Sequence, residues 1–146
     1  MKKDIIKDFL KQSNVVKVNG LYDDNKNIFQ CNLADGEILQ LYLSDESMMF
    51  FVQVGVLNDL RFQSPEVFIG LLSANNLGGR LYNQRISYDD VTSAVYICHD
   101  TYYKKISCAK DLDDELELFI ENSRIFASII KSIIIEPLEN SVEDNY

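Results

Sequence analysis

The sequence contains one histidine and three cysteines, too few for several common kinds of active site. A single histidine cannot form a histidine pair for a metal, and neither HExxH nor a Cys/His cluster is present. Cys31, Cys98 and Cys108 form no CxxC pair, and their odd number and wide spacing indicate free, mostly buried thiols in a reducing cytosol. His99, the one candidate base for a cysteine nucleophile, lies in an alternating apolar run. We therefore expect structural roles for the cysteines.

Motifs that bind phosphate or cations are also missing. Gly78-Gly79 is followed by Arg80-Leu81, matches neither GxGxxG nor GK[ST], and predicts the end of a helix. An EF-hand counted from Asp111 would need glycine at its sixth position and glutamate at its twelfth, where the chain has Leu116 and Asn122. The GxSxG of a nucleophile elbow is absent too. We expect no cofactor, no metal and no enzymatic activity.

Positive charge is scarce as well. The chain has 14 Lys and Arg against 23 Asp and Glu, a net charge of -9, which argues against a nucleic-acid binder. Nearly all of the excess negative charge lies in residues 111–146, where acidic residues far outnumber basic ones. This region is either a solvated helix face with a soluble tail or an acidic surface that steers a basic partner.

Long apolar runs are absent. No stretch approaches the roughly 18 consecutive apolar residues that indicate a transmembrane helix. Charges return at Lys7 and Asp8, which interrupts the apolar run that a signal peptide requires. We expect neither membrane insertion nor secretion by that route.

The chain does have the length and apolar content of one folded domain, with 146 residues of which 47% are hydrophobic. We predict an α+β domain over 1–136 and a flexible acidic tail over 137–146. Residues 2–13 predict an amphipathic helix, followed by a loop at Gly20 and Asp23-Asp24-Asn25. Strands predicted at 28–33, 37–43 and 48–56, with turns at 34–36 and 44–47, form an antiparallel meander.

The two faces of this meander differ less than expected. One face is wholly apolar, with Phe50, Val52, Val54 and Val56 on its last strand. The opposite face also carries apolar side chains beside the amides of Gln30, Asn32, Gln40 and Gln53, namely Ile28, Ile38, Tyr42, Met49 and Phe51. A free antiparallel sheet usually exposes polar residues. Either a second layer covers this face or the face binds a partner, and the sequence leaves both open.

Ser64-Pro65 predicts the start of a helix over 65–77. Asn75 falls on the apolar stripe of this helix, so its amide should hydrogen-bond to a neighbouring backbone. Two further strands are predicted at 80–86 and 93–99, with a turn at 87–91. The stretch Tyr102–Lys105 combines aromatic and cationic residues and is interpreted as a strand end whose lysines reach solvent.

The last predicted helix begins at Asp111, runs to about Ile135 and stops before Pro137. Its broad apolar stripe comprises Leu116, Phe119, Ile120, Ser123, Phe126, Ala127, Ile130, Ile133 and Ile134. Leu118, Ile125 and Ile129 form a second stripe beside it. One core needs a stripe of only somewhat over roughly 100°. The surplus predicts a second burial partner, most simply another copy of the chain.

Residues Val67–Gly79, with the run Leu71-Leu72-Ser73-Ala74-Asn75 ending near glycine, resemble the middle helix of the class I type III secretion chaperones, the Tir-chaperone family. The order helix, three strands, helix, two strands, helix in a small acidic chain extends the resemblance over about residues 1–135. The Tyr102–Lys105 segment departs from the pattern.

The resemblance implies an α-β-β-β-α-β-β-α fold with an antiparallel sheet packed with helices, in a homodimer of the bacterial cytoplasm. Such a chaperone binds the extended N-terminal segment of a cognate secreted effector and keeps it soluble and competent for export, without a nucleotide of its own. The export-apparatus ATPase is a further implied partner.

The predicted partner-binding residues are Ile5, Phe9, Ile28, Ile38, Tyr42, Met49 and Phe51. The predicted dimer interface comprises Phe68, Leu72, Leu77, Leu81, Leu118, Ile125 and Ile129. Two alternatives stay open: a small dimeric adaptor or immunity-type protein that binds a folded partner, and an enzyme with an unfamiliar site.

Overall fold

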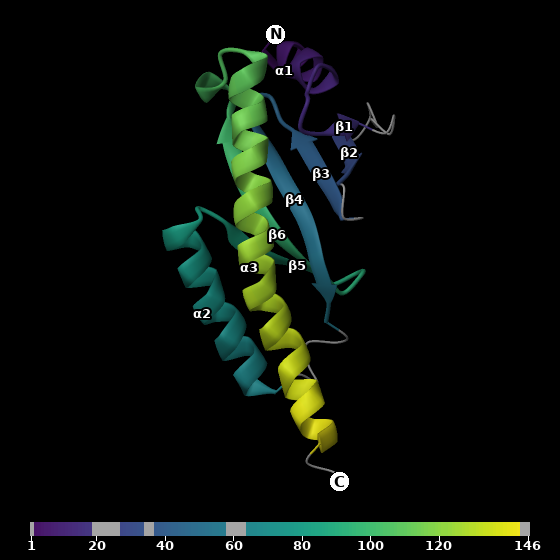
Figure 1. The fold of residues 1–146 in the computed structure, drawn as a ribbon, viewed down its shortest axis with the longest axis vertical. Coiled ribbons are helices and arrows are strands. Elements are labelled where there is room, and N and C mark those ends of the chain that lie inside the picture. The colour runs from purple at the N-terminus through teal and green to yellow at the C-terminus, as the bar shows by residue number, and fades with distance from the viewer. Residues whose placement is uncertain (1, 19–26, 34–36, 58–63, 144–146) are drawn as a thin grey trace. The chain divides into compact units, whose positions relative to one another are not determined.

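The computed structural model describes residues 2–18, 27–33, 37–57 and 64–143, with an α+β arrangement (Figure 1). Its elements are α1 (Lys2–Lys11), β1 (Lys17–Val18), β2 (Ile28–Asn32), β3 (Ile38–Leu43), β4 (Ser47–Val56), α2 (Pro65–Leu81), β5 (Arg85–Asp89), β6 (Ala94–Tyr102), the 3-10 helix η2 (Tyr103–Lys105) and α3 (Ala109–Glu143). The predicted order of elements is confirmed, with β1 as an additional short strand. The loop and turn predicted at Gly20–Asn25 and 34–36 lie outside the described residues.

The chain forms two compact units. Unit 1 contains Met1–Gln53 and Cys98–Glu121, and unit 2 contains Val54–Ile97 and Asn122–Tyr146. The strand order in unit 1 is β1-β2-β3-β4-β6, and in unit 2 it is β4-β6-β5. In the part of the chain that the structure describes, no helix combines the length and apolar character needed to cross a bilayer.

Unit 1 contains the predicted meander. Strands β2, β3 and β4 pair antiparallel, and β1 adds to β2, also antiparallel. The turn between β3 and β4 is confirmed at Ser44–Ser47, where the Ser44 N–H donates to the Ser47 carbonyl at 2.9 Å. Successive residues of a strand point to opposite faces, so every second side chain of β2, β3 and most of β4 is buried. Val56, at the end of β4, is 50% exposed and does not join the buried side chains of the face on which it was predicted.

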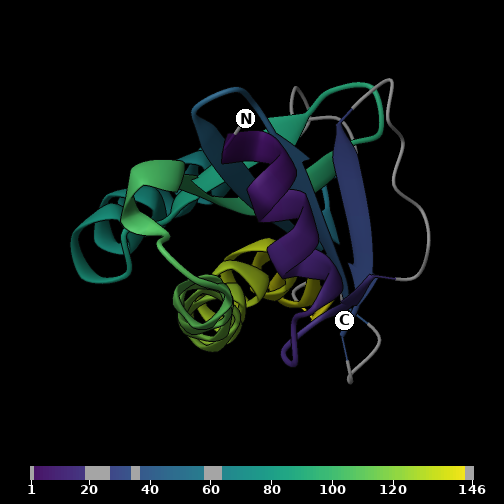
Figure 2. The same cartoon turned by 90° about the horizontal axis from the view of Figure 1, so that it is seen from above.

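The helices of unit 1 cover the apolar face of the meander. The Phe50 ring of β4 packs against Phe119 of α3 with ring centroids 5.2 Å apart. Helix α1 lies beside the N-terminal end of α3 (Figure 2), where the Ser13 hydroxyl donates to the Asp113 carboxylate at 2.5 Å. Lys2 Nζ donates to the Ile106 carbonyl at 2.8 Å. The core side of α1 consists of Ile6 and Leu10, which are buried.

Unit 2 contains α2 with β5 and the first part of β6. The predicted role of Asn75 is confirmed: its Oδ1 accepts a hydrogen bond of 2.7 Å from the backbone N–H of Ile86. The Tyr88 hydroxyl donates to the Leu57 carbonyl at 3.3 Å. These two bonds attach β5 to the last turns of α2 and to the residue that follows β4.

Helix α2 does not end at Gly78-Gly79, so that prediction is wrong. The helix continues to Leu81, and the left-handed residue that follows it is Asn83, with φ of 53°. Gly78 is buried where the Phe126 ring of α3 crosses it, and a Cβ at this position would collide with that ring. The glycine therefore permits close packing between two helices. The strand predicted at 80–86 therefore begins too early: Arg80 and Leu81 are helical, and β5 starts at Arg85.

The second strand pair is shifted from its predicted position. Strand β5 extends to Asp89, so the turn lies at 90–93 instead of 87–91 and includes Ser93 in the left-handed region, with φ of 60°. Strand β6 continues three residues past the predicted end at His99. Tyr102 ends the strand, and the following residues form η2.

Helix α3 begins at Ala109, not at Asp111. Asp111 lies in the first turn, and its carboxylate accepts a hydrogen bond of 2.9 Å from the backbone N–H of Ser107, which stabilises the entry to the helix. The helix continues past Pro137 to Glu143, beyond the predicted end at Ile135. A proline removes only one backbone donor, so it can be accommodated at a cost. The domain bounds and the mobility of 137–146 stay predictions.

Candidate partner-binding surfaces

The face of the meander opposite the core is the largest candidate surface in unit 1. We call it the outer meander face and define it by Ile28, Gln30, Asn32, Ile38, Gln40, Tyr42, Ser47, Met49, Phe51 and Gln53. Six of these ten residues are half-buried and four are exposed, whereas every residue between them on the three strands is buried. Ile38 and Tyr42 are 43% and 42% exposed. The rest of the described chain therefore does not cover this face.

The strand register joins these side chains into rows. Ile28 of β2 lies opposite Tyr42 of β3, which lies opposite Met49 of β4, so three apolar side chains form a band across the meander. In the next row, Gln40 lies between Gln30 and Phe51. Side chains in such register contact one another across strands. The band is continuous and can receive apolar side chains of a partner.

Helix α1 carries the other predicted partner-binding residues. Ile5 is exposed and Phe9 is half-buried, while Ile6 and Leu10 fill the core. The helix thus keeps apolar surface on its solvent side. Whether a partner contacts it stays a prediction.

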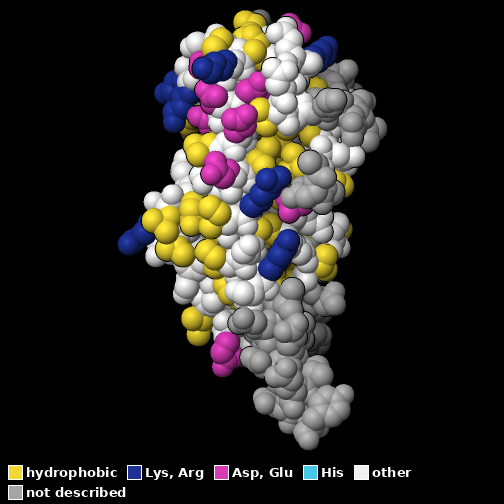
Figure 3. Space-filling model, in the orientation of Figure 1, with side chains coloured by type: hydrophobic (Ala, Val, Ile, Leu, Met, Phe, Trp, Pro, Cys, Tyr) yellow, Lys and Arg dark blue, Asp and Glu magenta, His cyan; other side chains and the backbone are white. Residues whose placement is uncertain are grey.

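A second apolar surface lies on α2 in unit 2, where hydrophobic side chains gather (Figure 3). Four of the residues predicted at the dimer interface are exposed here: Phe68, Leu72, Leu77 and Leu81. The Leu72 side chain has an exposed fraction of 71%. Ile69 is 63% exposed but was not predicted, since a helix wheel does not show which of two adjacent apolar positions faces solvent.

Beside α2, the same unit contains an apolar groove of about 180 Å³. It is lined by Leu57, Phe68, Leu71, Leu72, Asn75, Ile86, Tyr88 and Val95. No single motif of the sequence indicated this groove, because its walls come from four separate segments. It can accept one or two apolar side chains.

The two apolar stripes predicted on α3 differ in burial. Leu116 and Phe119 of the broad stripe are buried in unit 1, and Phe126 and Ile130 are buried in unit 2. The second stripe is accessible: Leu118 in unit 1 and Ile125 in unit 2 are exposed, and Ile129 is half-buried. The second stripe is therefore available for contacts outside the chain, while its place in a dimer interface stays a prediction.

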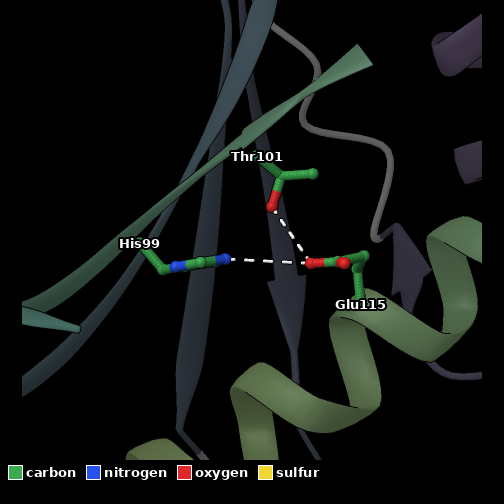
Figure 4. Close-up of polar contacts among 3 residues, drawn as sticks. All are labelled: His99, Thr101 and Glu115. Atoms are coloured by element: carbon green, nitrogen blue, oxygen red, sulfur yellow. Dashed lines mark hydrogen bonds and ion pairs between the residues drawn. The ribbon is translucent and has the colours of Figure 1, made fainter. Parts of the chain in front are cut away.

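The only histidine belongs to a small polar cluster in unit 1 (Figure 4). His99 Nε2 lies 3.7 Å from Glu115 Oε2, and the Thr101 hydroxyl donates to the same oxygen at 3.2 Å. The His99 ring stacks on Phe119, with centroids 6.1 Å apart. The hydroxyl donates to the carboxylate and not to the imidazole, so the cluster is not arranged as a nucleophile with its base. Its contacts fasten α3 to β6.

The cysteines are free, as predicted, and two of the three are buried. Burial raises the pKa of the Cys31 thiol from 9.0 to about 11, which keeps it protonated and unreactive at neutral pH. Cys108 is exposed. Among the described residues, no three His, Cys, Asp or Glu side chains lie close enough to hold a metal ion.

A hollow of about 520 Å³ in unit 1 was not predicted. It is lined by Lys2, Asp45, Glu46, Tyr102, Tyr103 and Lys104. The Tyr103 hydroxyl donates to the Ser44 carbonyl at 2.6 Å, and Lys104 Nζ lies 5.6 Å from the centre of the Tyr102 ring. The aromatic and cationic stretch at 102–105, interpreted from the sequence as a strand end, supplies Tyr102, Tyr103 and Lys104 to this lining. Its walls carry both signs of charge and so favour no class of ligand.

Neither a protein-family model nor a curated protein matches this sequence. Three solved complexes contain a chain with a similar fold. In the HopA1–SchA chaperone–effector complex, the chain is 15% identical with a TM-score of 0.62, over 86% of this chain and 92% of that chain. In the ExsC–ExsE complex, the chain is 12% identical with a TM-score of 0.66, over 88% of this chain and 95% of that chain. In the ExoU–SpcU complex of the type III secretion system of Pseudomonas aeruginosa, the chain is 16% identical with a TM-score of 0.62, over 90% of this chain and 98% of that chain.

An uncharacterised protein from Methanothermobacter thermautotrophicus also has this fold, with 10% identity and a TM-score of 0.60 over 92% of this chain and 99% of that chain. At such low identities these similarities establish the fold. This chain therefore shares its α+β fold with a chain in each of these complexes, of which one is a chaperone–effector complex and another belongs to a type III secretion system. The shared fold agrees with the fold that the resemblance implied.

Proposed function

We propose that this protein is a cytoplasmic chaperone that binds an extended N-terminal segment of a secreted effector and keeps it soluble and competent for export. The observation that carries the proposal is the uncovered apolar band of the outer meander face, on a fold shared with a chain of a chaperone–effector complex. The protein would act by binding alone, without a cofactor.

An extended segment suits this surface for an energetic reason. Ordering a flexible segment costs several kcal/mol, so the complex needs many apolar contacts. Burial of one large apolar side chain contributes on the order of 1.5–3 kcal/mol. Ile28, Tyr42 and Met49 offer three neighbouring contacts in one row, and Ile38 and Phe51 extend the surface along the strands. Ile5 and Phe9 of α1 would supply further apolar contacts.

The proposal is tested by co-expression of the chain with secreted proteins encoded in the same genome, followed by size measurement and limited proteolysis. We expect a soluble complex in which an N-terminal segment of the partner is protected although the segment is not folded. A partner that is folded and compact both alone and in the complex would support the adaptor or immunity-type alternative. No soluble complex with any secreted protein would overturn the proposal.

The site is tested with Tyr42→Asp. Tyr42 is exposed, so the variant should fold normally, and it interrupts the apolar band at its centre. We expect binding to weaken about tenfold or more, since roughly 1.4 kcal/mol is a factor of ten. Thr92→Asp, at an exposed turn position, adds the same charge elsewhere and should bind normally. Unchanged binding by Tyr42→Asp would exclude the outer meander face.

A further inference from the structure

The outer meander face carries no charged side chain. Its positions hold aliphatic, aromatic, methionine, amide and hydroxyl side chains only. In the whole chain 25% of residues are charged, and charged residues are usually found on surfaces. A partly exposed sheet face without charge is thus unusual for this protein, and it calls for an explanation beyond apolar content.

Gln40 lies at the centre of this face. Its cross-strand neighbours are Gln30 and Phe51, and its neighbours two residues away along β3 are Ile38 and Tyr42. All four neighbours are uncharged. A charge brought to this point by a partner would lose water and would find no opposite charge on the outer meander face.

We infer that the outer meander face, as the binding site of the proposed function, selects a partner segment that is itself uncharged where it contacts the face. The segment combines apolar side chains, which cover the Ile28–Tyr42–Met49 band, with amide or hydroxyl side chains or backbone groups beside Gln30 and Gln40. The inference rests on the proposed function and adds the chemical class of the segment.

The selection follows from desolvation. A buried charge without a partner is strongly disfavoured, whereas a buried amide or hydroxyl is tolerated once it is hydrogen-bonded. The adjacent amides of Gln30 and Gln40 can each donate and accept, so they can satisfy polar groups of an uncharged segment. A lysine or glutamate of the segment that lies beside Gln40 would have no such compensation, because the neighbours of Gln40 on the face are uncharged.

The selectivity has a boundary on the β6 side. In unit 1, β6 is the next strand after β4. His99 and Thr101 contact α3, so alternation places Asp100 on the opposite side of β6, and Asp100 is exposed. The Asp100 carboxylate therefore places a negative charge on β6, the strand next to the outer meander face. Charges in the partner are tolerated outside the segment that crosses β2, β3 and β4.

The inference is tested first by selection of random dodecapeptides displayed on phage against the immobilised full-length chain. Bound phage are compared in parallel on wild-type and Tyr42→Asp protein, which identifies peptides that need the outer meander face. We expect these peptides to be depleted in Lys, Arg, Asp and Glu and enriched in apolar and amide or hydroxyl residues relative to the unselected library. Charged residues at library frequency or above in these peptides would overturn the inference.

The second test uses a selected synthetic peptide and two variants of opposite charge, Gln40→Glu and Gln40→Lys, with Gln40→Met as the neutral control. Both charged variants should weaken peptide binding about tenfold or more, because either sign must be desolvated. Gln40→Met should bind within a few-fold of wild type. If one sign weakens binding and the other strengthens it, the face recognises charge and the inference is wrong. Circular dichroism and thermal melting establish that the variants fold.

Failure of the inference can be distinguished from failure of the proposed function. If no peptide depends on Tyr42, the outer meander face is not a binding site, and both statements fail. If peptides depend on Tyr42 but carry charges, or if the Gln40 variants respond to sign, binding at this face stands and only the selection for an uncharged segment fails.

Discussion

At the scale of single residues, Gly78 shows that a glycine in an apolar helical run can have either of two structural roles. A glycine at the end of an apolar helical run most often marks a helix end, where it adopts positive φ. Here it lies inside α2, and the absence of a side chain admits the Phe126 ring. The sequence could not separate these two roles, because the second depends on a residue 48 positions away.

Gly78→Ala should therefore destabilise the protein. The added Cβ would meet the buried Phe126 ring, which cannot move without disturbing the core. Overpacking of this kind costs about 1–3 kcal/mol, only partly offset by the gain of about 1 kcal/mol from replacing a helical glycine by alanine. Urea unfolding followed by circular dichroism measures the difference.

Gly79→Ala is the matched control. A Cβ at Gly79 would come no closer than 3.9 Å to the Gln84 carbonyl oxygen. Gly79 itself is exposed. Helix propensity alone should then raise the free energy of unfolding by up to about 1 kcal/mol. Equal destabilisation by both variants would mean that the contact with Phe126 is not the cause.

At the scale of elements, alternation and helical periodicity predicted which faces are buried. The residues at which helices and strands begin and end were predicted less accurately. The pattern of β2–β4 identified the core face, because it is a local property of each strand. The start of β5 and the end of α2 were wrong by several residues, because Arg80–Asn83 carries no decisive turn signal. Strand β1 was missed because two residues give no periodicity.

Asn75 is the element-scale contact that the sequence did predict, since a polar side chain on an apolar stripe must find a hydrogen-bond partner. Asn75→Ala removes the acceptor for the Ile86 N–H and leaves that donor unpaired between α2 and β5. We expect a loss of about 1–2 kcal/mol in the free energy of unfolding and faster amide exchange at Ile86. Hydrogen exchange monitored by NMR measures both effects.

The neighbouring Asn76 is exposed and provides the control. Asn76→Ala should leave the exchange rate of Ile86 unchanged and should alter stability by no more than a few tenths of a kcal/mol, in either direction. If Asn75→Ala behaved in the same way as Asn76→Ala, the hydrogen bond to Ile86 would not hold β5 in place.

At the scale of the whole molecule, the sequence predicted that the chain has more apolar surface than its own core covers. The exposure of Leu72, Leu81 and Ile125 agrees with this prediction. The groove beside α2 could not be predicted, because it is assembled from segments that are distant in sequence. Knowledge of the strand register was also needed to see that Ile28, Tyr42 and Met49 form one band.

The surplus apolar surface leads to the prediction of a homodimer. Large exposed apolar side chains on a single helix face mark protein–protein contacts, and a two-fold interface that pairs one patch with itself is the commonest arrangement. Leu72 is 71% exposed on α2 and lines the apolar groove, so it can pack into the same groove of a second copy. Light scattering at micromolar concentration should give about twice the chain mass of 16.8 kDa.

Leu72→Asp should convert this dimer to a folded monomer, since it places a charge in the interface without disturbing the core. Tyr42→Asp is the matched comparison, because it adds the same charge at an exposed apolar position of unit 1. It should remain dimeric while it loses partner binding. A wild-type chain that is monomeric at every concentration would contradict the homodimer. A Leu72→Asp variant that stays dimeric would move the interface away from α2, toward the accessible stripe of Leu118, Ile125 and Ile129.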